Sequence, residues 1–139
     1  MPARSSVFVD TAYLVALIDR TDGLHTRARQ LAIAFVSDRA RLHTSDAILI
    51  ELADYFCGGP FRRAALEWID AIRKDGRWDV VPLDRPLLRD AEARYRRYDD
   101  KNWSMTDCIS MEAMSQRRIR EVATADRGFE QAGFRALMA

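Results

Sequence analysis

Lysine, histidine and cysteine are scarce in this sequence of 139 residues, each occurring only twice. The net charge is +1, so no overall field draws the chain onto nucleic acid or an anionic membrane. No apolar run approaches the roughly 20 residues that a membrane-spanning helix needs. We therefore expect no membrane span and no function that depends on a large net charge.

The scarce cysteines and histidines form no metal-binding pattern. Cys57 and Cys108 share no ligand spacing, and both lie in apolar helical patterns, which predicts free, buried thiols in a reducing cytoplasm. His25 and His43 match no ligand spacing either, so we interpret them as surface or structural residues. The first ten residues lack the apolar stretch of a secretory signal peptide. These features favour a cytoplasmic protein.

Apolar residues are abundant enough for one core. They make up 48% of the sequence, with 31% charged residues, as in an ordinary soluble domain, and the chain forms most simply one domain, 1–139. Strand patterns alternate with helical patterns. This alternation predicts a three-layer α/β/α sandwich with a central, mainly parallel sheet of four to five strands. The expected strands are 6–9, 40–44, 78–83, 120–125 and an edge strand at 134–137.

The expected helices follow capping and breaking signals. Ser45 is a suitable cap for a helix that runs to about Phe56, where CGGP breaks it. Pro86 opens a later helix, whose inward face is expected to carry Leu87, Leu88, Ala91, Tyr95 and Tyr98. The other helices are expected at 11–19, 25–37 and 61–74, from Ser104 onward, and shortly after residue 126.

Two acidic residues follow strands of the expected sheet. Asp10 ends the first strand, and Asp126 follows the strand at 120–125. If both strands are parallel, the two acids emerge at one edge of the sheet, outside the carboxyl ends of the strands, where sheets of this type form their sites. Taken alone, each acid is explained more simply as the N-cap of the following helix.

Two further acids lie on or near inward helix faces. Glu51 borders the apolar face of its helix, beside Ile48 and Tyr55, and a solvated flank residue explains it equally well. Asp107 lies inside the apolar face of its helix. Ser104 and Asp107 match a capping box, in which the acid bonds back to the cap. The box does not explain the inward direction, where an ionised carboxylate needs a cation, hydrogen bonds or a raised pKa.

Together the four acids predict a metal site. Four anions at one edge repel one another, and no lysine or arginine in these segments is placed to pair with all of them. A divalent cation resolves the repulsion, and all-oxygen ligands favour Mg²⁺ or Mn²⁺ over zinc. Threonines flank three of the acids, where a hydroxyl can hold a carboxylate or a metal-bound water; strand propensity or capping explains each equally well. They are Thr11, Thr106 and Thr124.

Four segments resemble one family: VFVDTAYLVALID, TSDAILIELADYF, DKNWSMTDCISMEAM and VATADRGFEQAGF. The chain resembles the PIN domain, and most closely the VapC-type ribonuclease toxins of bacterial toxin–antitoxin pairs. The resemblance covers nearly the whole chain, and the third and fourth segments together are quite specific. The chain departs from the family at Gly128, where many relatives carry histidine.

The resemblance implies an activity, a site and partners. It implies an endoribonuclease that hydrolyses RNA phosphodiester bonds at a metal site formed by Asp10, Glu51, Asp107 and Asp126. Asp10 and Asp107 are then expected as direct ligands of Mg²⁺ or Mn²⁺. Asp126 is expected as a direct or water-mediated ligand, and Glu51 as a ligand of a second ion or the residue that orients the attacking water. The resemblance also implies a homodimer and a cognate antitoxin that inhibits the toxin.

RNA contacts and alternative functions stay open from the sequence. Arg97, Trp103 and Arg127 are candidate contacts for phosphates and bases, although a solvated helix face explains an arginine such as Arg97 as well. A non-catalytic PIN-like module that binds RNA or protein is one alternative function. A receiver-like phospho-acceptor domain is another, but it needs a second acid beside Asp10 and a lysine that ends a late strand, and the sequence has neither.

Overall fold

A five-stranded, fully parallel sheet forms the centre of the structure, a computed structural model that describes residues 5–139. The strand order is β3-β2-β1-β4-β5, so the sheet grows in both directions from β1. The parallel pairing confirms the predicted fold class, and the short last strand is the predicted edge strand. The strands are β1 Ser6–Val9, β2 Arg41–Ser45, β3 Trp78–Val81, β4 Glu121–Ala123 and β5 Arg135–Ala136.

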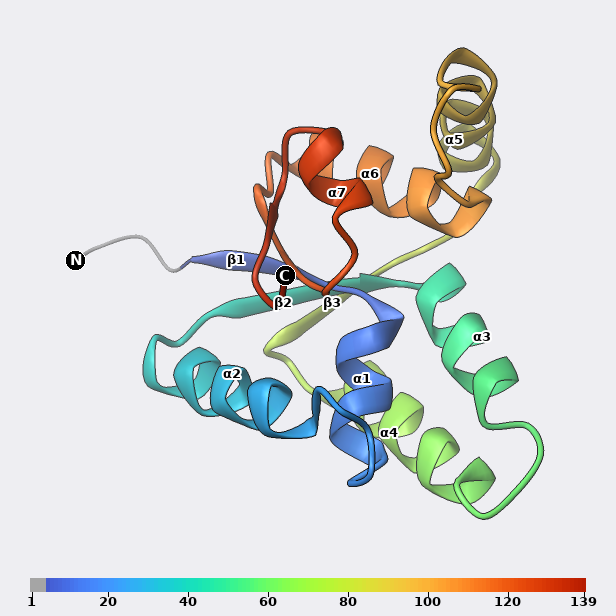
Figure 1. The fold of residues 1–139 in the computed structure, drawn as a ribbon. Coiled ribbons are helices and arrows are strands. Elements are labelled where there is room, and N and C mark those ends of the chain that lie inside the picture. The colour runs from blue at the N-terminus through green and yellow to red at the C-terminus, as the bar shows by residue number, and fades with distance from the viewer. Residues whose placement is uncertain (1–4) are drawn as a thin grey trace.

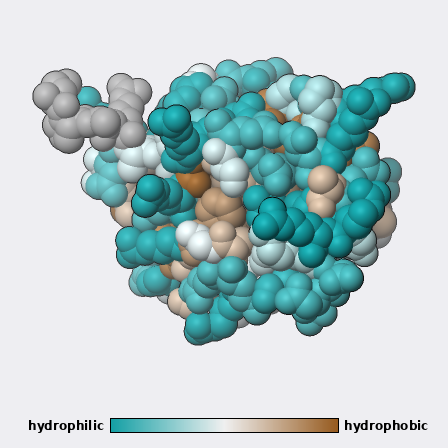
Figure 2. Space-filling view, turned by 90° about the horizontal axis from the view of Figure 1, so that it is seen from above, coloured by the Kyte–Doolittle hydropathy of each residue, from teal (hydrophilic) through white to brown (hydrophobic). Residues whose placement is uncertain are grey.

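Helices cover both faces of the sheet and complete the predicted three layers (Figure 1). The first four lie on one face and the last three on the other, as right-handed crossovers between parallel strands require. Seen from the side of the last three helices, the surface is mainly hydrophilic, with a small apolar group near its middle (Figure 2). The helices are α1 Thr11–Ile18, α2 His25–Ser37, α3 Asp46–Tyr55, α4 Arg62–Lys74, α5 Arg85–Arg97, α6 Met105–Arg117 and α7 Gly128–Gln131.

One apolar core surrounds the sheet and fixes the point at which β1 ends. Phe8 of β1, Leu52 of α3 and Met111 of α6 are completely buried, and burying such a side chain contributes roughly 1.5–3 kcal/mol. β1 lies between β2 and β4. Val9 is therefore the last residue enclosed on both sides, and Asp10 leaves the sheet at its carboxyl edge.

Local signals end the elements close to their predicted bounds. Ser45 caps α3 by accepting a hydrogen bond from the Ile48 N–H at 3.2 Å. β3 ends at Val81 rather than at residue 83, because Pro82 has no N–H with which to continue the ladder. The strand predicted at 120–125 is shortened to β4, because the N–H of Thr124 turns back onto a carbonyl of β4.

Three side chains that the helical patterns place inside are exposed: Cys57, Tyr95 and, on α3, Tyr55 at 61%. Cys57 lies beyond the last residue of α3, in the turn before α4, so the apolar pattern does not extend to it. Tyr95 is 52% exposed; its neighbour Arg94 faces α6 instead, where Nε lies 2.8 Å from the Glu112 carboxylate. Cys108 is buried, as predicted.

The two histidines are structural, as predicted. The Nδ1 atom of His25 lies 2.7 Å from the carbonyl oxygen of Ala16, which joins α2 to α1. His43 is buried in β2, and this burial lowers the pKa of its imidazole. Neither side chain lies among the acids at the carboxyl edge.

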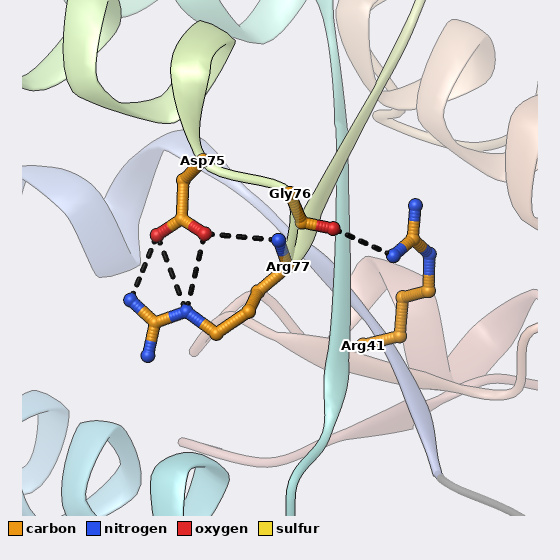
Figure 3. A network of polar contacts seen from close by, with 4 residues as sticks. All are labelled: Arg41, Asp75, Gly76 and Arg77. Carbon is orange, nitrogen blue, oxygen red and sulfur yellow. Dashed lines mark hydrogen bonds and ion pairs between the residues drawn. The ribbon is translucent and has the colours of Figure 1, made fainter.

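An arginine network ties the amino ends of two strands at the opposite edge of the sheet (Figure 3). The Arg77 backbone N–H donates to Asp75 at 2.9 Å, and its guanidinium Nη2 lies 2.7 Å from the same carboxylate. These bonds lower the pKa of Asp75 to about 2. Arg41, at the start of β2, donates to the Gly76 carbonyl oxygen at 2.8 Å. The turn before β3 is thus joined to the start of β2.

No helix in residues 5–139 has the length and apolar character that crossing a bilayer requires.

Candidate metal and active site

Asp10 follows β1 and does not cap α1. It occupies the N-cap position, but its side chain makes no capping hydrogen bond. Instead, Oδ2 accepts a hydrogen bond from the Thr124 hydroxyl at 2.7 Å, and the residue is only 8% exposed. The residue that follows the neighbouring strand β4 therefore holds this carboxylate, and helix capping does not account for it.

Thr124 links the two acids that follow β1 and β4. Its buried hydroxyl donates to Asp10 and accepts a hydrogen bond from the Asp126 N–H at 3.2 Å. The Asp126 carboxylate is exposed, and its Oδ1 accepts a hydrogen bond from the Gly128 N–H at 2.8 Å. Because β1 and β4 are adjacent and parallel, the two acids share one edge of the sheet, as predicted.

Asp107 has both of the roles that the sequence leaves open. Its N–H donates to the Ser104 hydroxyl, and its Oδ2 accepts from the Ser104 N–H, each at 3.0 Å, so the capping box is complete. The side chain is also half-buried and faces the other acids. The box starts α6 at the position from which the first turn directs this carboxylate toward the sheet edge.

Glu51 joins the group from the second turn of α3. It is half-buried, and its Oε1 accepts a hydrogen bond from the Thr11 hydroxyl, at the start of α1. A residue on a solvated flank would have no such partner. The contact therefore turns this acid toward the helix that follows Asp10.

One open hollow contains all four acids. Its volume is about 490 Å³, and residues from the ends of β1 and β4 and from α1, α3 and α6 form its walls. Among the residues that line it are Asp10, Thr11, Glu51, Asp107, Thr124 and Asp126. The structure thus brings together side chains that are up to 116 positions apart in the sequence, from residue 10 to residue 126.

The pKa values of two acids reflect this setting. Burial raises the pKa of Asp10 from its ordinary 3.8 to about 6, opposed by the Thr124 hydrogen bond and increased by the charges of Asp107 and Glu51. Burial also raises the pKa of Asp107, with a further rise from the charge of Asp126. Crowding of like charges adds to both rises in pKa, but burial is the larger cause in both cases.

No basic side chain balances these charges. In residues 5–139, none of the four carboxylates takes part in an ion pair. Buried carboxylates without a cation are costly when ionised. The hollow therefore favours a positively charged ligand.

The donor set suits Mg²⁺ or Mn²⁺ without forming a closed cage. Across the described residues, no three His, Cys, Asp or Glu side chains stand together as a ready set of metal ligands. Instead, hydroxyls and backbone N–H groups hold the carboxylates. Mg²⁺ keeps several waters and needs only one or two direct carboxylates. Oxygen donors around an uncompensated negative charge fit such an ion.

The remaining predicted residues lie in different places. Thr106 is half-buried on α6 but does not line the hollow. Arg127 is exposed and lies 3.5 Å from Glu130, and Arg97 is exposed over the ring of Tyr98. Trp103 is only 7% exposed, so it offers no open face on which a base can stack. Of these four, none borders the acids directly in the hollow.

Two further residues of the hollow escape the sequence argument. Asp22, in the turn between α1 and α2, lines it, and its Oδ1 accepts a hydrogen bond from the Leu24 N–H at 2.8 Å. In the sequence, Asp22 lies in a T-D-G turn, and this pattern does not indicate that the residue lines the hollow. Tyr55 also lines the hollow although it is 61% exposed. Its position one helical turn after Glu51 is the signal that a helical wheel offers.

Comparisons with known proteins agree with this architecture. The sequence profile of the PIN domain matches residues 7–135. VapC20 of Mycobacterium tuberculosis, a toxin that cleaves the sarcin–ricin loop, is 26% identical with a TM-score of 0.77 over 92% of this chain and 95% of that chain. FitAcB from Neisseria gonorrhoeae shares the fold at 16% identity, with a TM-score of 0.65 over 94% of each chain. No curated protein matches the chain significantly. The profile spans nearly the whole chain, so the chain belongs to the PIN-domain family, and its structure matches that of a VapC toxin, as the resemblance predicted.

Proposed function

We propose that this protein is a Mg²⁺- or Mn²⁺-dependent endoribonuclease and the toxin of a toxin–antitoxin pair. The observation that carries the proposal is the hollow at the carboxyl edge, which four carboxylates line without an ion-pair partner in residues 5–139. Membership of the PIN-domain family and the likeness to VapC20, a toxin that cleaves the sarcin–ricin loop, support it.

The four acids have different parts in the proposed reaction. Asp10 and Asp107 would hold the cation, and Asp126 would contribute directly or through water. When bound, a divalent cation offsets charge on the phosphate and lowers the pKa of water. Thr11 fixes Oε1 of Glu51, which leaves Oε2 to orient the attacking water and accept its proton.

A cognate antitoxin is the proposed inhibitor, and a homodimer the proposed assembly. Exposed large apolar side chains gather mainly on the helix layer that holds α2, α3 and α4, where Ile33 is 67% exposed and Val36 66%. Single exposed apolar residues are normal on a surface, but Ile33 and Val36 lie three positions apart on one helix and together are a candidate contact surface. A cytoplasmic location fits the two free cysteines.

A non-catalytic PIN-like module is the alternative that an assay separates. The receiver-like alternative does not agree with membership of the PIN-domain family. Purified protein is incubated with total RNA in Mg²⁺, in Mn²⁺ and in EDTA. We expect discrete fragments with either ion and none in EDTA. Cleavage that persists in EDTA argues against metal dependence, and intact RNA in every condition favours the binding module.

A further inference from the structure

A second, polar pocket adjoins the acid hollow. Its volume is about 280 Å³, and it lies between the segment before α6 and the helix α7. Asp126 borders both the pocket and the hollow. A group bound in this pocket would therefore lie next to the proposed cleavage site.

Trp103 and Gly128 give this pocket its shape. The indole of Trp103 packs against Tyr98 with ring centroids 5.0 Å apart. A Cβ atom at Gly128 would lie 3.0 Å from Oδ1 of Asp126 and 3.2 Å from Cδ1 of Trp103, closer than ordinary carbon contacts. With a larger residue here, the indole or the carboxylate would have to move away by a few tenths of an ångström. Trp103 thus forms a fixed wall rather than a free stacking surface.

The indole of Trp103 determines how the side-chain amide of Gln131 is oriented. The indole Nε1–H of Trp103 lies 3.3 Å from Oε1 of Gln131. Since an indole nitrogen can only donate, it must face the amide oxygen. The NH₂ group of Gln131 is therefore left to donate to a ligand. Gln131 lines the pocket, so its amide presents hydrogen-bond donors beside the proposed cleavage site.

The segment before α6 supplies acceptors to the same pocket. Asp100 lines it, is 68% exposed and has a loose ion pair with Lys101 at 3.4 Å. Asn102 adds a second amide. Two carboxylates, Asp100 and Asp126, and one cation, Lys101, line the pocket. Its net negative charge disfavours a phosphate, so the pocket suits an uncharged group that carries both donors and acceptors. A nucleobase is such a group, and unpaired bases are what proteins read in RNA.

We propose that this pocket receives one base of the bound RNA and prefers guanine. Guanine presents an acceptor at O6 beside two donors, N1–H and N2–H₂. The NH₂ group of Gln131 donates to O6, and the carboxylate of Asp100 accepts from the two donors. Uracil offers only one donor beside its acceptor, and adenine and cytosine present the opposite pattern at the matching atoms. The inference rests on the proposed function, because it takes RNA as the ligand.

Binding without metal tests the pocket separately from cleavage. Hexamers of uridine that carry one central guanosine, adenosine or cytidine are titrated into ¹⁵N-labelled protein in EDTA. The indole N–H resonance of Trp103, assigned with Trp103→Phe, reports occupation of the pocket. We expect the guanosine hexamer to move this resonance and to bind about ten-fold more tightly than the others. This is the discrimination that one bidentate hydrogen-bonded contact to a base usually provides.

Gln131→Glu is the decisive variant. It keeps an oxygen for the Trp103 indole but replaces the NH₂ donors with an acceptor, so the guanosine preference should disappear. Gln30→Glu, an exposed residue on α2, makes the same charge change elsewhere and should keep the preference. An unmoved Trp103 resonance, equal binding of all hexamers, or an unchanged preference in Gln131→Glu overturns the inference. Base-selective binding by a protein that cuts no RNA with Mg²⁺ or Mn²⁺ would instead refute the proposed nuclease and leave the pocket standing.

Discussion

In Asp10, burial and the charges of neighbouring acids both raise the pKa of the carboxyl group. The end of β1 places it under the edge of the sheet, and Thr124 is its hydrogen-bond partner. Its pKa of about 6 means that the folded protein binds a proton more tightly than the unfolded chain, whose value is near 3.8. The stability that this proton provides is fully present below pH 3.8 and is lost as the pH rises through 6.

Asp10→Asn is therefore expected to stabilise the metal-free protein at pH 7.5. The gain should be on the order of 3 kcal/mol, from the shift of its pKa, and it should vanish near pH 3.5, where both side chains are neutral. Denaturant unfolding of parent and variant in EDTA at several pH values measures this difference. A difference that does not change with pH would show that burial does not raise the pKa of Asp10.

Single residues were predictable from the sequence to different degrees. Asp10 and Asp107 could be found because strand ends and helical wheels depend on local periodicity. The packing of Trp103 against Gly128 could not, because it depends on where α7 returns to the segment before α6. Burial of an aromatic side chain in such a segment is a tertiary property.

At the scale of elements, the start of α6 both stabilises the helix and orients the carboxylate of Asp107. The capping box satisfies two backbone N–H groups at the helix end, and the same geometry directs Asp107 into the hollow. The cap of α5 is a natural control. There Asp84 accepts a hydrogen bond from the Leu87 N–H at 3.0 Å, but no acid of the hollow lies on that helix.

Ser104→Ala and Asp84→Ala should therefore separate the two effects of a cap. Each is expected to lower the free energy of unfolding by about 1 kcal/mol. Only Ser104→Ala should also slow RNA cleavage, because it frees the first turn that holds Asp107. Unfolding curves and cleavage rates of both variants give the comparison. Equal cleavage by the two variants would mean that the cap does not position the acid.

Element boundaries were predictable wherever one residue imposes them. Ser45 begins α3 as predicted, while Pro82 stops β3 two residues early. Cys57 and Tyr95 were placed inside by helical patterns that ignore where a helix ends and which neighbour it meets. The contact with a neighbouring helix explains Tyr95: Arg94, rather than Tyr95, faces α6, where it forms an ion pair with Glu112.

At the scale of the whole molecule, the two ends of the parallel strands differ: stabilising contacts lie at the amino ends, and the candidate site lies at the carboxyl ends. The arginine network ties the amino ends of β2 and β3, while the carboxyl ends of β1 and β4 carry acids without basic partners in residues 5–139. Alternation of strands and helices was sufficient to predict this edge. The order of strands was not predictable in the same way, because it depends on long-range pairing.

A divalent cation should therefore stabilise the folded protein. Binding at 100 times the dissociation constant adds about 2.7 kcal/mol, so Mg²⁺ or Mn²⁺ should raise the melting temperature at pH 7.5 above that in NaCl of equal ionic strength. The rise should be much smaller for Asp10→Asn. Equal shifts in both proteins would indicate a general salt effect.

The central claim is that the acids of the hollow cut RNA, and Asp107→Asn tests it most directly. Asparagine keeps an oxygen for the Ser104 N–H, so the variant should remain folded by circular dichroism. Its cleavage rate with Mn²⁺ should fall by about two orders of magnitude or more, as when one strong electrostatic contact in an active site is removed. A folded Asp107→Asn variant that cuts RNA as fast as the parent would contradict the account.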